Sequence, residues 1–170
     1  GQKFADAIFR DQDGGEAKDV LYAVDAAIRR NPWIDSQRLG IEGGSYGGQL
    51  TNWIITQTDR FRAAIPSAGI SNLISFNYMA YYHDYLAVEF GAFPHQEQLM
   101  DFLWERSPLK HVANVKTPTL FIHGENETTF AIVDAAALAA YQLPDTHCLS
   151  RNGKWSPISD FWATMAKVRR

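Results

Sequence analysis

A serine lies at the tip of a glycine-rich turn, in the segment Gly43-Gly44-Ser45-Tyr46-Gly47. The pattern G-x-S-x-G between an apolar strand and a helix is typical of a nucleophile elbow. Such a turn strains the backbone of its tip residue, so neighbouring positions must lack a Cβ atom for the two arms to pass. The pattern predicts Ser45 as a nucleophile and the amide of Tyr46, at a helix start, as an oxyanion donor. An ordinary glycine-rich turn with a surface serine is the alternative.

The elements that position this turn follow an alternating α/β pattern. The expected elements are a helix over 16–30, a strand over 38–42, a helix over 46–58, a strand over 61–67 and a buried strand over 118–124. Strand, helix and strand in this order predict a βαβ unit with parallel strands. Near the end, residues 146–149 are expected to form a short strand, and Ser156-Pro157 predicts the start of a final helix.

Residues 71–104 are crowded with aromatic side chains and show no strand period. We interpret this segment as helices and loops inserted over the sheet, above the elbow. Part of it is expected to line a substrate pocket, and Tyr81 and Tyr82 are the candidates for substrate contacts. The alternative is that these aromatic side chains form the core of the insertion.

Composition and charge exclude several classes of protein. Hydrophobic residues make up 46% of the 170 residues and aromatic residues 13%, which is enough for a core. The net charge of −3 without a basic stripe argues against a nucleic-acid partner. The single cysteine, Cys148, excludes an internal disulfide and favours a cytoplasmic protein. No apolar stretch is long enough to span a membrane, and the five histidines lack the short spacing of a metal site.

Several short motifs occur in a fixed order along the chain. They are Gly43-Gly44-Ser45-Tyr46-Gly47-Gly48, Thr51-Asn52-Trp53, Asp59-Arg60-Phe61, Pro66-Ser67-Ala68-Gly69, Ser107-Pro108, and Thr117-Pro118-Thr119-Leu120 through His123-Gly124. Over residues 1–124 the chain resembles the catalytic domain of the prolyl oligopeptidase family, in the branch of acylaminoacyl-peptidase and dipeptidyl-aminopeptidase-like enzymes. The resemblance implies an α/β-hydrolase fold and a serine peptidase that acts on short peptides through a Ser-Asp-His triad, without metal or cofactor.

The triad acid is expected just after a late strand, because the chain order in this fold is nucleophile, acid, histidine. The family pattern at that place is His-Gly-x-x-Asp, and this chain has Glu127 where the family has aspartate. Glutamate also serves as the triad acid on this fold. Glu127 is therefore the candidate acid, and a solvated loop carboxylate is the alternative.

The triad base is harder to assign. The family places its histidine in a Gly-His-Gly-like turn after the last strand, and the corresponding residues 151–155 hold no histidine. His147 is the histidine downstream of Glu127, so it is the candidate base, although it lies inside the expected strand. The alternative is a strand histidine with a local hydrogen bond. His123 is expected to be structural.

The stretch before the elbow is short for this fold. Only 44 residues precede Ser45, and they contain one helix and one strand. We therefore expect residues 1–170 to form a single, partial α/β-hydrolase domain, a parallel sheet flanked by helices that lacks the N-terminal strands and the loop of the second oxyanion amide. The unpaired edge of a central strand predicts a homo-oligomer, aggregation or a missing N-terminal segment.

Three functions remain open from the sequence. The first is a serine peptidase with Ser45, Glu127 and His147 as the triad. The second is a non-catalytic remnant of the fold that acts as a binding or oligomerisation module. The third is an esterase on the same fold, since a serine triad hydrolyses both kinds of bond.

Overall fold

The centre of the molecule is a small parallel sheet. In the computed structural model, which describes residues 1–79, 84–96, 98–123, 147–149 and 155–157, strand β1 (Gly40–Gly44) pairs in parallel with β2 (Ala63–Ser67). On the other side of β2, Thr119 bridges Ala64 and Ile122 bridges Ser67, both in parallel. The parallel βαβ unit and the third extended segment that the sequence predicted are therefore confirmed.

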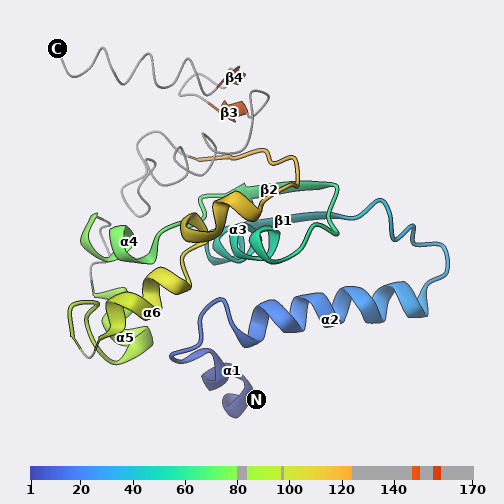
Figure 1. Cartoon of the computed structure of the whole chain (residues 1–170). Helices are drawn as coiled ribbons and strands as arrows, with labels where there is room; N and C mark the ends of the chain where they lie inside the picture. The colour runs from blue at the N-terminus through green and yellow to red at the C-terminus, as the bar shows by residue number, and fades with distance from the viewer. Residues whose placement is uncertain (80–83, 97, 124–146, 150–154, 158–170) are drawn as a thin grey trace.

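Helix α3 (Tyr46–Gln57) connects β1 to β2, and α2 (Gly15–Arg30) packs beside it (Figure 1). The apolar stripe of α2 and the inner residues of α3 and β1 enclose the buried side chains of Ala17, Ile54 and Phe61. The partly buried residues around them are Val20, Leu21, Val24, Leu39, Ile41, Leu50 and Trp53. This core packs α3 against the sheet and so fixes the position at which α3 begins.

Helix α2 has well-defined ends. At its start, Asp11 Oδ2 accepts a hydrogen bond from Gly15 N–H at 2.9 Å, which satisfies one of the free donors of the first turn. At its end, Arg29 and Arg30 lie in the last turn, where positive charge complements the helix dipole. Asn31 caps the C-terminus, and Pro32 cannot continue the helix.

A second cluster lies beside the sheet and is built by three short helices, α4 (Leu73–Met79), α5 (Tyr85–Phe90) and α6 (Leu99–Glu105). Figure 1 shows them gathered together, on the side away from the C-terminal end of α2. Their buried core consists of Ile70, Leu73, Phe76, Leu86, Phe90 and Leu103. The helices expected in residues 71–104 are thus present, and two of the aromatic residues, Phe76 and Phe90, serve as core.

Short elements complete the described chain. Helix α1 (Gln2–Ala5) and the 3-10 turn η1 (Asp6–Ile8) precede α2, and the 3-10 helix η2 (Pro108–Asn114) leads into the segment 118–122. Strands β3 (His147–Leu149) and β4 (Trp155–Pro157) form an antiparallel pair. The short strand expected at 146–149 is confirmed.

The helix start expected at Ser156-Pro157 is wrong, because these residues belong to β4, and the rest of that expected helix lies outside the described residues. The capping pattern concerns only the backbone at the helix start, whereas pairing with β3, whose residues 147–149 stand shortly before β4 in the chain, supplies backbone hydrogen bonds from another strand. A proline is compatible with an edge strand, where its missing N–H faces no partner. None of the helices in the described part of the chain combines the length and the hydrophobicity that a membrane-spanning helix needs.

Candidate active site

Ser45 occupies the sharp turn between β1 and α3. Its backbone angles are φ 55° and ψ −121°, a conformation that residues with a Cβ atom rarely adopt. Such a residue stores about 1–3 kcal/mol of strain, which the surrounding structure must supply. The strained turn that the glycine pattern predicted is present in the structure.

Backbone hydrogen bonds hold this turn from both sides. Ser45 N–H donates to the carbonyl of Ser67, at the end of β2, at 2.9 Å. The carbonyl of Ser45 accepts from the N–H groups of Gly48 at 2.9 Å and Gln49 at 3.0 Å. The turn is therefore clamped between the neighbouring strand and the first turn of its own helix.

The glycines of the turn are required to different degrees. A Cβ atom on Gly43 would strike the backbone of Gly47, so Gly43 must lack a side chain. A Cβ atom on Gly48 would lie 3.0 Å from the Cα of Gly69, on the loop after β2, so these two glycines let helix and loop touch. By contrast, Cβ atoms on Gly44 and Gly47 would meet nothing within 4 Å. Gly69 was not singled out by the G-x-S-x-G pattern, because its role depends on a contact across the fold.

The side chain of Ser45 is exposed. Across the described ranges, no side chain forms a hydrogen bond with its Oγ atom. The turn thus presents the serine hydroxyl on the surface of the described part of the chain, at the carboxyl end of β1. Ligands of open parallel sheets bind at this end of the strands.

Tyr46 is the first residue of α3, so its N–H belongs to the donors that a helix start leaves free. Its side chain points into the protein, where the hydroxyl donates to Glu16 Oε1 at 2.5 Å. Burial raises the pKa of the Tyr46 hydroxyl well above its usual range, and the hydrogen bond to Glu16 adds to this shift. The hydroxyl therefore stays protonated and remains a donor at every physiological pH.

The loop before α2 reaches the same helix through a second, fully buried contact. Gln49 Nε2 donates to Asp13 Oδ2 at 2.7 Å, and the two side chains are 0% and 1% exposed. Burial raises the pKa of Asp13 from 3.8 to about 7; the hydrogen bond from Gln49 opposes this shift, and the charge of Glu16 adds to it. Loop and elbow helix are thus joined by a buried polar network.

This network extends to the short helices. Gln12 Nε2 donates to the hydroxyl of Tyr85 at 3.2 Å, and Arg106 donates to the carbonyl of Gln12 at 3.2 Å. Arg106 also forms an ion pair with Asp11 at 2.9 Å. The sequence predicted no structural role for residues 1–15. In the structure, residues 11–13 connect the start of α2 with α3 and with the short helices. The spacing of Asp13 and Glu16 around a helix start resembles a capping box, and this signal could have indicated that the segment is structured.

The other predicted site residues remain predictions. Glu127, Tyr81 and Tyr82 lie outside the described residues. His147 lies in β3, opposite Pro157 of β4, as the strand prediction implied. The structure therefore joins Ser45 and Tyr46 in one turn and leaves the roles of Glu127 and His147 as predictions. His123 is buried at the end of the segment 118–122.

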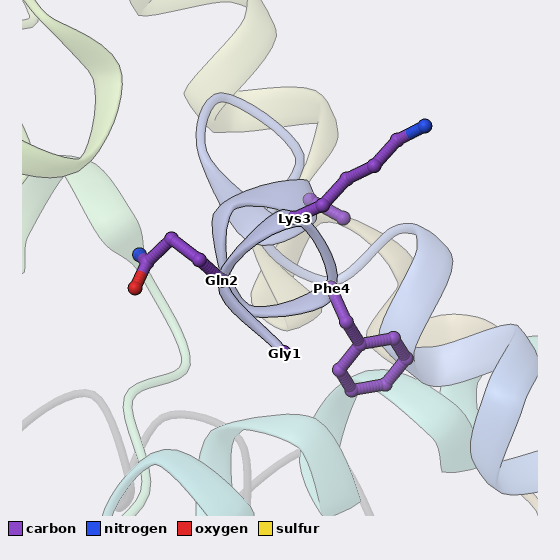
Figure 2. A pocket seen from close by; sticks show the side chains of 5 residues that line it. Gly1, Gln2, Lys3 and Phe4 are labelled. Atoms are coloured by element: carbon purple, nitrogen blue, oxygen red, sulfur yellow. The ribbon is translucent and has the colours of Figure 1, made fainter.

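Two features of the described residues bear on ligand binding. Among the described residues, no group of three or more histidine, cysteine, aspartate and glutamate side chains is arranged to hold a metal ion. An open hollow is lined by Gly1, Gln2, Lys3, Phe4 and Ala7. Figure 2 shows that the side chains of Gln2, Lys3 and Phe4 leave α1 in different directions instead of converging on one point. This hollow lacks the convergent polar groups of a binding site.

Comparison with known protein families identifies the lineage. The model of the prolyl oligopeptidase family, Peptidase_S9, matches residues 1–146. The chain belongs to this family. The match extends beyond residue 124, where the resemblance found in the sequence motifs ended, and includes the position of Glu127.

Curated relatives of this prolyl oligopeptidase family member are peptidases. The uncharacterized peptidase YuxL of Bacillus subtilis is 46% identical over 141 residues, which cover 81% of this chain and 21% of that protein. Dipeptidyl-peptidase 5 of Porphyromonas gingivalis is 36% identical over 145 residues, covering 83% and 21%. The chain therefore spans about a fifth of the length of these relatives.

Solved structures agree with the family assignment. The acylaminoacyl peptidase of Pyrococcus horikoshii superposes with a TM-score of 0.75 at 27% identity, covering 83% of this chain and 23% of that one. A puromycin-hydrolyzing peptidase of Mycobacterium tuberculosis gives 0.72 at 31% identity, covering 84% and 22%. The chain thus has a partial α/β-hydrolase fold, as the sequence predicted.

Proposed function

We propose that this chain carries the nucleophile of a serine peptidase. The observation that supports this most directly is the strained turn at Ser45, which sets an exposed hydroxyl at the carboxyl end of β1. Tyr46 N–H, at the start of α3, is the proposed donor to the oxyanion. Glu127 and His147 are the proposed acid and base of the triad.

The proposed reaction is acyl transfer in two steps. The Oγ atom of Ser45 attacks the scissile carbonyl carbon, and its proton passes to the base, which then protonates the leaving amine. The C–N bond breaks and an acyl-enzyme forms. Water then attacks the acyl-enzyme, the same base accepts the water proton, and Ser45 is released.

The proposed substrates are short peptides. Relatives named as dipeptidyl-peptidases and acylamino-acid-releasing enzymes favour this class. We further propose that Tyr81 and Tyr82 contact the substrate, since they fall between α4 and α5 in residues 71–104, the proposed insertion over the sheet.

A fluorophosphonate probe tests the nucleophile directly, because it reacts with activated serines. We expect covalent labelling of the full 170-residue chain, loss of labelling in Ser45→Ala, and unchanged labelling in Ser36→Ala, which alters an exposed serine outside the turn. A folded chain that does not react contradicts the catalytic proposal and leaves the non-catalytic module. A chain that cleaves activated esters but no peptide amide contradicts the peptidase class and favours the esterase.

The sheet edge supports a proposal about assembly. Within the described residues, β1 pairs with β2 and with no other strand, and three of its five residues are exposed. We infer that another strand, from a second copy or from a further segment, covers this edge in the working protein. Light scattering during gel filtration is expected to show dimers or larger species. A stable monomer that binds no hydrophobic dye contradicts this inference.

A further inference from the structure

The carboxylate of Glu16 accepts three hydrogen bonds, two from the loop before α2 and one from α3. Oε1 accepts from the backbone N–H of Asp13 at 2.6 Å and from the hydroxyl of Tyr46 at 2.5 Å. Oε2 accepts from the backbone N–H of Gly14 at 3.2 Å. Two of these bonds cap the start of α2, whereas the third crosses to the first residue of α3.

The bond to Tyr46 is not explained by helix capping. A capping carboxylate needs backbone donors alone, and Asp11 already supplies a second carboxylate at the same helix start through Gly15 N–H. The other oxygen of the Asp11 carboxylate accepts a hydrogen bond from Arg106 at 2.9 Å. Of these two acidic side chains, Glu16 alone reaches the elbow helix.

Tyr46 is held at two points by this arrangement. Its backbone follows directly from the clamped turn at Ser45, and its hydroxyl is fixed by Glu16. Because the ring is rigid, fixing both ends restricts the side-chain torsions and the orientation of the peptide group that carries its N–H. Without the bond to Glu16, the backbone of the turn and of α3 would restrain this residue, and its side chain would add nothing.

A second bond holds the same helix face. Gln49 lies three residues after Tyr46, so the two side chains leave α3 on the same side. Gln49 Nε2 donates to the buried carboxyl of Asp13 at 2.7 Å. Residues 13–16 therefore bind the side chains of Tyr46 and Gln49 in the first turn of α3. These two bonds oppose a rotation of α3 relative to the sheet.

We propose that Glu16 is a positioning residue, which orients the Tyr46 N–H toward the oxyanion through the hydroxyl of the Tyr46 side chain. This inference rests on the proposed serine peptidase function, because it concerns the oxyanion donor of that site. It extends the site beyond the elbow to a residue that precedes Ser45 by 29 positions. An interaction that aims a donor acts on the transition state more than on ground-state binding.

The test measures inactivation of the full chain by a fluorophosphonate, separating the maximal rate from the half-saturating concentration. Tyr46→Phe and Glu16→Ala are each expected to lower the maximal rate about 10-fold with little change in the half-saturating concentration. This loss is smaller than the ~100-fold or larger loss that follows complete removal of an oxyanion donor, because the Tyr46 N–H is still present in both variants. The double variant is expected to be no slower than either single one. Glu16→Gln, which keeps an acceptor oxygen for the hydroxyl, is expected to restore most of the rate.

Asp11→Ala is the matched control, since it removes a capping carboxylate from the same helix start without touching Tyr46. It is expected to lower the melting temperature but to leave the maximal rate within about 2-fold. Additive effects of Tyr46→Phe and Glu16→Ala, or an unchanged rate in Tyr46→Phe, overturn the proposal.

A second readout separates this inference from the proposed function. If the folded wild-type chain does not react, the nucleophile proposal fails, and the positioning role is measured by 15N relaxation of the residue-46 amide. Glu16→Ala and Tyr46→Phe are expected to lower its order parameter, whereas Asp11→Ala is not. An unchanged order parameter in the first two variants overturns the positioning role on its own.

Discussion

Gln49 Nε2 lies 2.7 Å from Oδ2 of Asp13, and both side chains are closed off from solvent. This pair joins the loop before α2 to the helix that follows the elbow. It combines a neutral amide with a carboxyl group whose pKa is raised to about 7, chiefly by burial. The bond that holds the loop to the elbow helix therefore depends on pH.

The first prediction concerns the pH dependence of stability. The ordinary pKa of an aspartate such as Asp13 is 3.8, and its pKa in the folded chain is about 7. Between these two pH values the folded chain therefore keeps a proton that the unfolded chain releases. The stabilisation of the folded state by protonated Asp13 is fully present below pH 3.8 and is lost as the pH rises through about 7. The loss in the free energy of unfolding is on the order of 4 kcal/mol.

Asp13→Asn removes this titration while keeping an acceptor oxygen for Gln49. We expect its free energy of unfolding, relative to wild type, to increase as the pH is raised from 5 to 8 in urea titrations. Asp19→Asn, which alters an exposed carboxylate on α2, serves as the control and is expected to show a much smaller change. Parallel pH profiles for wild type and Asp13→Asn would rule out a protonated Asp13.

The second prediction concerns the close approach of α3 and the loop after β2. A Cβ atom on Gly48 would lie 2.5 Å from the carbonyl oxygen of Ser67 and 3.0 Å from the Cα of Gly69. Because backbone atoms cannot move aside cheaply, Gly48→Ala is expected to cost about 1–3 kcal/mol of stability. Gly44→Ala, which has open space around its Cβ, is expected to stay within about 1 kcal/mol of wild type in the same denaturation assay.

The local chemistry of the chain predicted the strained turn at Ser45 well. Ser45 could be assigned to a strained turn because the glycines that permit it stand beside it in the sequence. The same holds for α2, whose apolar stripe and terminal Asn31-Pro32 are local signals. Gln12 and Asp13 were missed because polar residues in a glycine-rich stretch are usually solvated, and only contacts with Tyr85 and Gln49 bury them.

Strand pairing also explains the wrong helix start at Ser156-Pro157. The capping pattern there is a real propensity, but β4 pairs with β3 through residues 147–149. Gly69 is a similar case, since only the folded structure brings it against Gly48. Sequence reasoning thus succeeded where the physical cause lay within one element or turn, and it failed where the cause was a contact between two separate segments.

The third prediction concerns the core of the short helices. Leu103 of α6 is fully buried among Leu73, Leu86 and Phe90. Leu103→Ala removes this packing and is expected to cost about 2–5 kcal/mol, measured by thermal or urea unfolding. Val88→Ala in α5 is the comparison, because Val88 is 69% exposed and its truncation is expected to stay within about 0.5 kcal/mol. Equal losses for the two variants would mean that this cluster contributes no packing energy.

The last prediction concerns strain at Ser45, the proposed nucleophile. Ser45 and an alanine in its place both carry a Cβ atom at φ 55°, whereas glycine adopts this conformation without the same steric conflict. Glycine also loses more entropy on folding, by about 0.5–1 kcal/mol, which offsets part of the relief of about 1–3 kcal/mol. We therefore expect Ser45→Gly to exceed Ser45→Ala in stability by about 1 kcal/mol, or roughly 2–4 °C in melting temperature.

The same pair of substitutions at Ser36 provides the control. Ser36 is exposed and is not among the residues with positive φ, so glycine there gains no relief and Ser36→Gly is expected to be less stable than Ser36→Ala. The sign of the glycine-minus-alanine difference should therefore reverse between the two positions. If Ser45→Gly is no more stable than Ser45→Ala, the turn stores no strain, and the exposed serine would be held in place without a cost to the fold.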